Sequence, residues 1–309
     1  MTHIKSIDQG KVLRNISSIL CISLAILMIS FGKAIKDSIY NGLLFSLTTI
    51  IPTLFPFFIL SDLWTSFFYV DQNGRICQAF EKIFRANGCA ITALISGLVC
   101  GFPIGVKVLS ELYREEKITK DEFEYLSGFV NNPSCAFVIS GVGAGIYKDV
   151  KIGILLYSAV LLSSFITGFI FRPKSINHNK TKENQRQTFN FTESIKNAGL
   201  TSINVLSCII FFSGFIGLIS SVVKNTAIIN SISLILEVTN AVEMIFSAHR
   251  LTLSYKLILN AFALGFSGFS VHIQAFGFMP KEISKAKYLL MKSTQGVISS
   301  LLVSIIFSM

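Results

Sequence analysis

The chain has 309 residues, of which 51% are hydrophobic and only 14% are charged, and its mean hydropathy is +0.63. These values exclude an ordinary soluble domain. The net charge is +10, but the basic residues lie in short loops between apolar runs. This pattern is typical of membrane-flanking charge and argues against a nucleic-acid partner. The six cysteines form no Cys-x-x-Cys pair, so we expect neither a metal site nor a disulfide framework.

Long uncharged runs define the expected membrane segments, because about 20 apolar residues cross a bilayer. These runs are 16–32, 38–61, 86–106, 125–147, 152–171, 197–223, 257–279 and 293–309, and a further apolar stretch, 225–248, contains Glu237 and Glu243. Helices satisfy their own backbone hydrogen bonds in lipid. We therefore predict an all-α polytopic membrane protein of about seven to nine membrane helices.

The first region, 1–37, is expected to be an N-terminal membrane helix with its flanks. Three basic residues precede its apolar run, as in a signal peptide, but the run ends in "FGK" at 31–33 without a small-x-small cleavage site. A retained helix with a cytoplasmic N-terminus is therefore predicted.

A polar linker, 172–193, divides the rest into two membrane halves, 38–171 and 194–309. Together with Lys196 it carries six lysines and arginines, which predicts a cytoplasmic location. The stretch from Ser38 aligns without gaps with the stretch from Ser194, and the same offset places Glu81 on Glu237. Because transporter folds are commonly built from repeats, we predict an inverted internal repeat.

Two re-entrant hairpins are predicted. If every run crossed once, the linker and the N-terminus would lie on opposite sides, against the charge pattern. A hairpin at 88–112, broken at "GFPIG", removes this conflict, and a second is expected at 257–279, around "LGFSGFS". For 225–248, the charge pattern favours a crossing and the repeat favours an interfacial position, so both stay open.

A helix is predicted to begin near Lys120. Thr119 and Glu122 have the spacing of a capping box. This helix should be broken in "NNPS", where Pro133 removes a backbone hydrogen bond.

Four stretches carry polar residues or breaks inside apolar runs, which in membrane proteins indicate a binding site or pathway. The candidate solute-binding residues are Gly101, Pro103, Gly105, Lys107, Asn131, Asn132, Ser134, Glu237, Asn240, Ser267, Gly268, Ser270, His272 and Gln274.

Each stretch also has a purely structural interpretation. Lys107 could anchor a helix at the interface, and Asn131 with Asn132 could join neighbouring helices. Glu237 could face water from an interfacial helix, and His272 could be one hydrogen-bonded buried histidine. No phosphate loop, Gly-x-Ser-x-Gly or His-Glu-x-x-His motif occurs, so we expect no enzyme activity and no cofactor or metal.

Five stretches together resemble the YlbJ family of sporulation integral membrane proteins, within the nucleoside-recognition or gate-domain group. They are "IPTLFPFFILSDL" (51–63), "GFPIGVKVLSELYREEKITKDEFEYL" (101–126), "FVNNPSCAFVISGVG" (129–143), "LEVTNAV" (236–242) and "GFSGFSVHIQ" (265–274). The resemblance implies a fold with two re-entrant hairpins, two interfacial helices and an inverted repeat, in a mother-cell or forespore membrane. The chain departs from the family's glycine-proline pattern at Pro133, Ser134 and Cys135, which leaves the substrate open.

Two functions follow as expectations. In the first, the protein moves or binds a small polar solute, nucleoside-like solutes included, together with a coupling cation, during spore envelope formation. In the second, it is a non-transporting morphogenetic protein that acts through partners in spore cortex or coat assembly. Membrane lipid and other spore envelope proteins are the expected partners, and nucleic acid is not.

Overall fold

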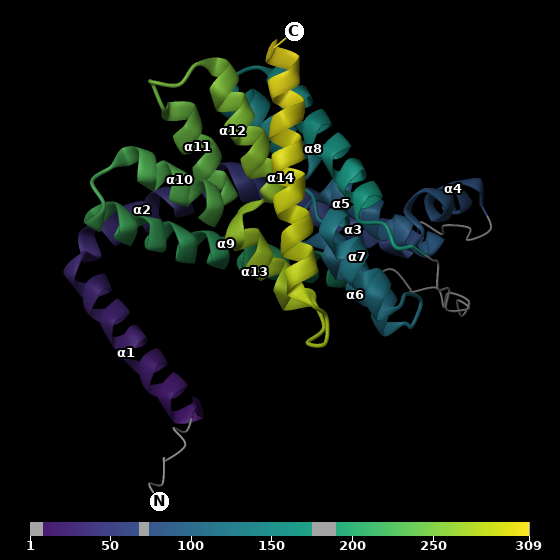
Figure 1. The fold of residues 1–309 in the computed structure, drawn as a ribbon, viewed down its shortest axis with the longest axis horizontal. Helices are drawn as coiled ribbons and strands as arrows, with labels where there is room; N and C mark the ends of the chain where they lie inside the picture. The colour runs from purple at the N-terminus through teal and green to yellow at the C-terminus, as the bar shows by residue number, and fades with distance from the viewer. Residues whose placement is uncertain (1–8, 68–73, 175–189, 309) are drawn as a thin grey trace, which may run out of the picture.

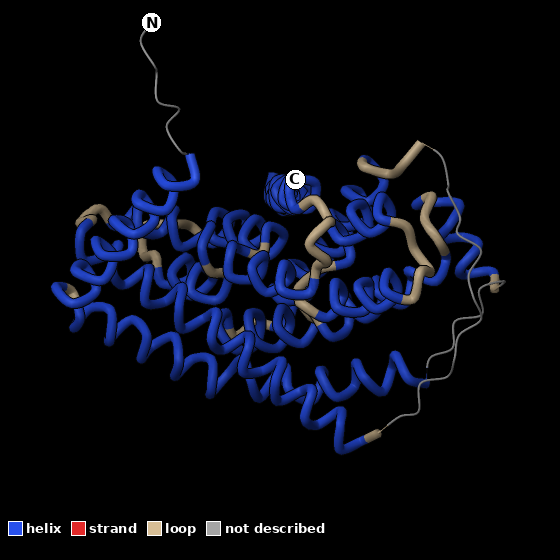
Figure 2. The backbone as a smooth tube through the Cα atoms, turned by 90° about the horizontal axis from the view of Figure 1, so that it is seen from below, coloured by secondary structure: helices blue, strands red, loops and turns tan. Residues whose placement is uncertain are grey.

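The computed structural model describes residues 9–67, 74–174 and 190–308. Within these residues the chain forms helices and loops and no strand (Figure 2). Helix α1 (Gln9–Ser30) extends away from the body that the other helices form (Figure 1). The all-α expectation is therefore confirmed for the described part of the chain.

Each half begins with a long helical stretch, and these two stretches pack against each other. Helix α2 (Gly32–Phe45), the π-helical turn η1 (Ser46–Ile50) and α3 (Ile51–Phe67) follow one another, and α9 (Phe191–Val222) packs against both α2 and α3. Small residues allow this close approach. The Ser38 hydroxyl donates to the Ser213 carbonyl at 2.7 Å, and Gly42 faces the Ser213 side chain.

The chain then turns a corner into a pair of short helices. Helix α4 (Arg75–Phe84) and the apolar stretch Gly88–Cys100, which comprises the 3₁₀ turn η2 (Gly88–Ala90) and α5 (Ile91–Cys100), are bent by 99° relative to each other. Helix α6 (Ile104–Arg114) follows the break at 101–103 and packs against α5.

Helix α7 (Lys120–Val130) begins as predicted, because the Thr119 side chain and the Glu122 side chain form a reciprocal capping box. It ends at the predicted break, and the π-helix η3 (Ala136–Tyr147) continues the chain. Helix α8 (Val150–Ile170) begins at Asp149, whose carboxylate accepts from the backbone amide of Lys151.

The second half contains two further breaks. Helices α10 (Thr226–Leu236) and α11 (Val238–Ser247) meet at Glu237, and α12 (Leu253–Phe266) and α13 (Gly268–Phe278) meet at Ser267. Helix α14 (Lys285–Ser308) packs against α7, α8 and α12, and so joins the two halves (Figure 1).

Among the described residues, five helical stretches are long and apolar enough to cross a membrane, or six if the bent α4–α5 pair counts as one span. The five are Gly32–Leu60, Val150–Ile170, Phe191–Val222, Leu253–Phe278 and Lys285–Ser308. This number is below the seven to nine expected. The difference arises because the runs at 125–147 and 225–248 are each divided into short helices, and the apolar part of α1 is only Ser17–Ser30.

At the position of the second predicted hairpin the structure differs from the prediction. Residues 257–279 lie in α12 and α13, which together form one stretch long enough to span. Paired short helices occur instead at α10 and α11, which pack against each other. Most of the predicted linker, 175–189, lies outside the described residues, and α9 already begins inside it, at Phe191.

Candidate functional site

Three helix breaks and one face of α13 meet around a small cavity. Gly101 and Phe102 come from the α5–α6 break, Ser134 from the α7–η3 break, Glu237 from the α10–α11 break and Gln274 from α13. The remaining lining residues are Ile50, Leu54, Phe137, Val205, Ile209, Val238, Thr239 and Val271. Residues far apart in the chain thus place a few polar groups in an otherwise apolar wall.

Two glycines bring the breaks into contact. Gly101 has a φ of 85°, and a Cβ at this position would lie 2.7 Å from the backbone nitrogen of Ser134. Gly268 has a φ of 74°, and a Cβ there would lie 3.1 Å from the backbone nitrogen of Val238. Because only glycine adopts positive φ at low cost, each glycine lets one break lie directly against another.

Glu237 provides the acidic group of the cavity. It is 1% exposed, and its carboxylate accepts from the Thr239 hydroxyl and, at 2.7 Å, from the backbone amide of Asn240. These bonds cap the start of α11. Within the described residues, no basic side chain forms an ion pair with Glu237.

Gln274 and Ser134 supply the other polar groups that face this region. The buried Gln274 Oε1 has no hydrogen-bond partner among the described residues, while its Nε2 donates to the Ser270 hydroxyl at 3.5 Å. The Ser134 hydroxyl accepts from the backbone amide of Phe137 at 3.1 Å, at the start of η3. The wall therefore presents oxygen acceptors, including one that is buried and unpaired.

The cavity is small. The space open to the centres of water molecules in it is about 20 Å³. This volume accommodates one or two water molecules or one small ion, and it excludes a solute of nucleoside size in this conformation.

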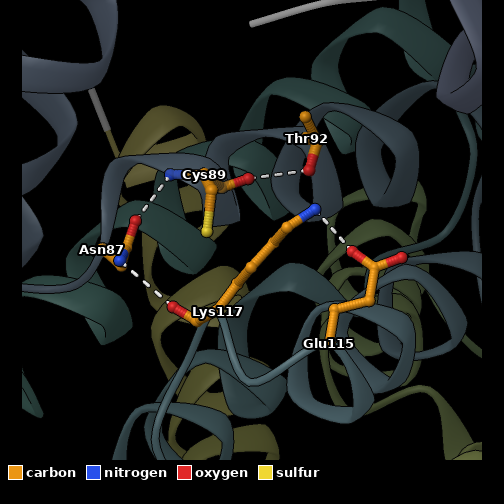
Figure 3. A network of polar contacts seen from close by, with 5 residues as sticks. All are labelled: Asn87, Cys89, Thr92, Glu115 and Lys117. Atoms are coloured by element: carbon orange, nitrogen blue, oxygen red, sulfur yellow. Dashed lines mark hydrogen bonds and ion pairs between the residues drawn. The ribbon is translucent and has the colours of Figure 1, made fainter. Parts of the chain in front are cut away.

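Polar contacts fix the base of the α5–α6 pair at the end opposite the cavity (Figure 3). Asn87 accepts from the backbone amide of Cys89 at 3.1 Å and donates to the Lys117 carbonyl at 3.1 Å. The Thr92 hydroxyl donates to the Cys89 carbonyl at 2.7 Å, and Lys117 pairs with Glu115. The bond from Asn87 to the Lys117 carbonyl joins the α4–α5 corner to the α6–α7 loop, and the break at 101–103 lies at the other end of the α5–α6 pair.

A second polar cluster lies at the C-terminal end of α7. Lys292 of α14 is fully buried, and its ammonium donates to the backbone carbonyl of Asn131 at 2.8 Å and to Gln295 Oε1 at 2.7 Å. Gln295 in turn donates to the Asn132 side-chain oxygen at 2.7 Å, and Asn132 donates to the Ser164 hydroxyl of α8 at 3.1 Å. The cluster therefore joins α7, α8 and α14.

Tyr288 extends this cluster to α13. The Asn131 amide donates to the Tyr288 hydroxyl at 2.9 Å, and His272 Nδ1 lies 3.1 Å from the same hydroxyl. All three side chains are buried. His272 thus lies in a hydrogen-bonded aromatic environment and does not line the cavity.

The structure distributes the fourteen candidate residues over three groups. Gly101, Ser134, Glu237 and Gln274 line the cavity, and Gly268 and Asn240 contact the Glu237 break. Asn131, Asn132 and His272 belong to the second cluster. The remaining five, Pro103, Gly105, Lys107, Ser267 and Ser270, are not among the cavity-lining residues.

The members of that last group make other contacts. Gly105 lies against the Val130 carbonyl, and Lys107 is half-buried. Ser267 donates to the Leu264 carbonyl at 3.2 Å.

Sequence reasoning missed the polar cluster residues that α14 contributes: Tyr288, Lys292 and Gln295. Lys292 is the last of four lysines, at 281, 285, 287 and 292, that precede the apolar run 293–309. The spacing of Tyr288, Lys292 and Gln295 could have indicated the cluster, because residues three or four positions apart lie on one face of a helix. Ser299 extends the same face.

The comparisons with known proteins give one informative similarity. No family model matches the chain, and no solved structure matches it. The chain is 27% identical to the curated sporulation integral membrane protein YlbJ of Bacillus subtilis strain 168, over 91% of this chain and 79% of the relative. Together with the apolar helices, this similarity supports the assignment of the chain as an integral membrane protein of the YlbJ sporulation type.

Proposed function

We propose that this protein binds a small polar solute or a cation at the cavity between its helix breaks and moves it across a membrane during spore formation. The observation that carries the proposal is the convergence of Gly101, Ser134, Glu237 and Gln274 from four separate elements on one small space. Transporters place their sites at such broken helices, where backbone and amide groups are free to coordinate a ligand.

In this proposal α5 and α6 form a re-entrant hairpin of the gate-domain type. They pack against each other on both sides of the break at 101–103, and their base is tied at one end by Asn87 and Lys117. The N-terminus and the 172–193 linker are proposed to be cytoplasmic because of their basic residues.

We also propose that α10 and α11 are the counterpart of α5 and α6 in an internal repeat. In each half a pair of short helices meets a broken longer helix through a glycine contact: Gly101 against Ser134 in the first, and Gly268 against Val238 in the second. The gapless alignment that pairs Glu81 with Glu237 does not match this correspondence, since Glu81 lies within α4.

The size of the cavity limits what can bind in this conformation. A small cation or water fits, whereas a nucleoside-like solute requires the α5–α6 tip to move away from Ser134. A buried carboxylate without a basic partner suits a cation or a proton. The relative's name, a sporulation integral membrane protein, supports a cell or forespore membrane as the site of action.

The test is ligand binding to the purified full chain in detergent, followed as a rise in melting temperature. Sodium, potassium and lithium salts, nucleosides and purine bases serve as the probes. We expect at least one probe to stabilise the protein and Glu237→Gln to weaken its binding by about tenfold or more, because the carboxylate charge is lost.

Glu81→Gln is the matched control, since Glu81 lies on α4 outside the cavity, where its carboxylate accepts from the Gly88 amide at 2.9 Å. It should bind like the parent chain. Complementation of a Bacillus subtilis strain lacking YlbJ gives a second readout. If Glu237→Gln and Gln274→Ala restored heat-resistant spores as well as the parent chain did, the cavity would not be the working site, and a role through protein partners would be favoured.

A further inference from the structure

The ammonium of Lys292 is buried, and its hydrogen-bond partners in the described part of the chain are uncharged. Its side chain is fully buried, and within the described residues no acidic side chain pairs with it. Instead, two neutral oxygens accept from it: the Asn131 carbonyl at 2.8 Å and Gln295 Oε1 at 2.7 Å. A buried charge is costly unless its surroundings compensate it, and these two oxygens supply part of that compensation.

The end of helix α7 supplies part of that compensation. Helix α7 ends at Val130, and Asn131 is its C-terminal cap. The last carbonyls of a helix carry partial negative charge, which favours a cation at that end. Asn131 Oδ1 is also buried and has no hydrogen-bond partner among the described residues, so the same residue adds further unpaired negative potential.

The surrounding contacts connect the ammonium to a segment that reaches the cavity. Asn131 and Asn132 are both bound by α14, through Lys292, Tyr288 and Gln295. Ser134, two residues further on, lines the cavity, and Gly101 lies against it. The backbone from Asn131 to Ser134 therefore connects Lys292 to the cavity wall, and a substitution at Lys292 can displace that wall.

We propose that Lys292 is a built-in counter-cation: its ammonium occupies a monovalent-cation position created by the broken end of α7, and holds the 131–134 segment in place. The ligand class of the position is a singly charged cation coordinated by carbonyl and amide oxygens. In the native chain the side chain of α14 fills it, so no free metal ion is needed there.

Chemical rescue tests this proposal. Lys292→Ala removes the side chain beyond Cβ, and n-propylammonium has the size and charge of the fragment removed. In detergent, at constant ionic strength, we expect the variant to melt about 10 °C below the parent chain. Adding n-propylammonium chloride should recover about half of that loss or more, whereas neutral 1-propanol and sodium chloride should recover less.

Met291→Ala is the matched control. Met291 is the neighbouring residue on α14, is equally buried and contacts Gly128 of α7, but it carries no charge. It should lose stability through the cavity it leaves and show no rescue by n-propylammonium. Equal rescue of both variants, or equal rescue by propanol, would overturn the proposal.

If the alanine variant does not fold, Lys292→Met still tests the proposal, because methionine has a side chain of similar length to lysine and carries no charge. We expect faster amide hydrogen exchange at 131–135 in this variant than in the parent chain. Parental exchange there would show that the charge does not hold the segment. Because these readouts need no solute, they are independent of whether the cavity transports anything.

Discussion

The two glycine-mediated contacts between helix breaks differ in chemistry. At the Gly101 contact, the α5–α6 tip meets Ser134, and the nearby polar side chain is a neutral hydroxyl. At the Gly268 contact, the α12–α13 break meets the backbone of Val238 and Glu237, and Glu237 carries the carboxylate that caps α11. The first contact is tighter and uncharged, and the second is looser and acidic. One joint therefore depends mainly on backbone fit and the other on the bonds of one carboxylate.

Substituting the two glycines tests this difference most strongly. Gly101→Ala places a Cβ 2.7 Å from a backbone nitrogen at a φ of 85° and should cost about 3 kcal/mol of stability. Gly268→Ala, with 3.1 Å to the nearest atom, should cost about 1 to 2 kcal/mol.

Thermal unfolding of both variants in the same detergent shows which of the two loses more stability. Gly199→Ala is the control, because nothing lies within 4 Å of a Cβ at that position in α9, and alanine should stabilise the helix slightly. A larger loss for Gly268→Ala than for Gly101→Ala would contradict the ranking of the two joints.

Side-chain substitutions at the same joints should have smaller effects than Gly101→Ala. Thr239→Val removes the hydroxyl that donates to Glu237 and should cost about 2 kcal/mol, since hydrogen bonds to a charged group are the stronger ones. Ser134→Ala removes an acceptor for the Phe137 amide and should cost about 1 kcal/mol. Melting temperatures of the two variants and of their double mutant give the comparison. Equal losses would remove the distinction between an acidic and a neutral joint.

The smallest effect is expected at Lys107. It follows the α5–α6 break in sequence but is not a cavity-lining residue. Lys107→Ala should therefore change the affinity for any ligand of the cavity by less than about threefold, well under one tenfold step. Titration of the variant beside Glu237→Gln measures this. A loss of affinity as large as that of Glu237→Gln would show that Lys107 contributes to the binding site.

The sequence was sufficient for features with a local signal. The breaks at "GFPIG", "NNPS" and "GFSGFS" contain glycine or proline, and the Thr119 capping box has a fixed spacing, so each was located correctly. The break at Glu237 has no glycine or proline, and the sequence therefore did not predict that α10 and α11 divide there.

The sequence pattern did not predict which residues far apart in the chain contact each other. Burial of Lys292 depends on a hydrogen bond to a residue 161 positions earlier, and basic residues near an apolar run usually lie at the interface. The cavity likewise depends on which breaks meet. The second hairpin predicted at 257–279 illustrates the limit, because the glycine signal was correct while the packing of α10 against α11 was not foreseen.

The position of α14 also has a consequence for the order of assembly. The broken end of α7 is made early, but its partners Tyr288, Lys292 and Gln295 are all on α14. While a ribosome is still extending the chain, Asn131 and Asn132 lack these partners. The polar contacts at the broken end of α7 can therefore form in full only after α14 has been made and packs against α7, α8 and α12.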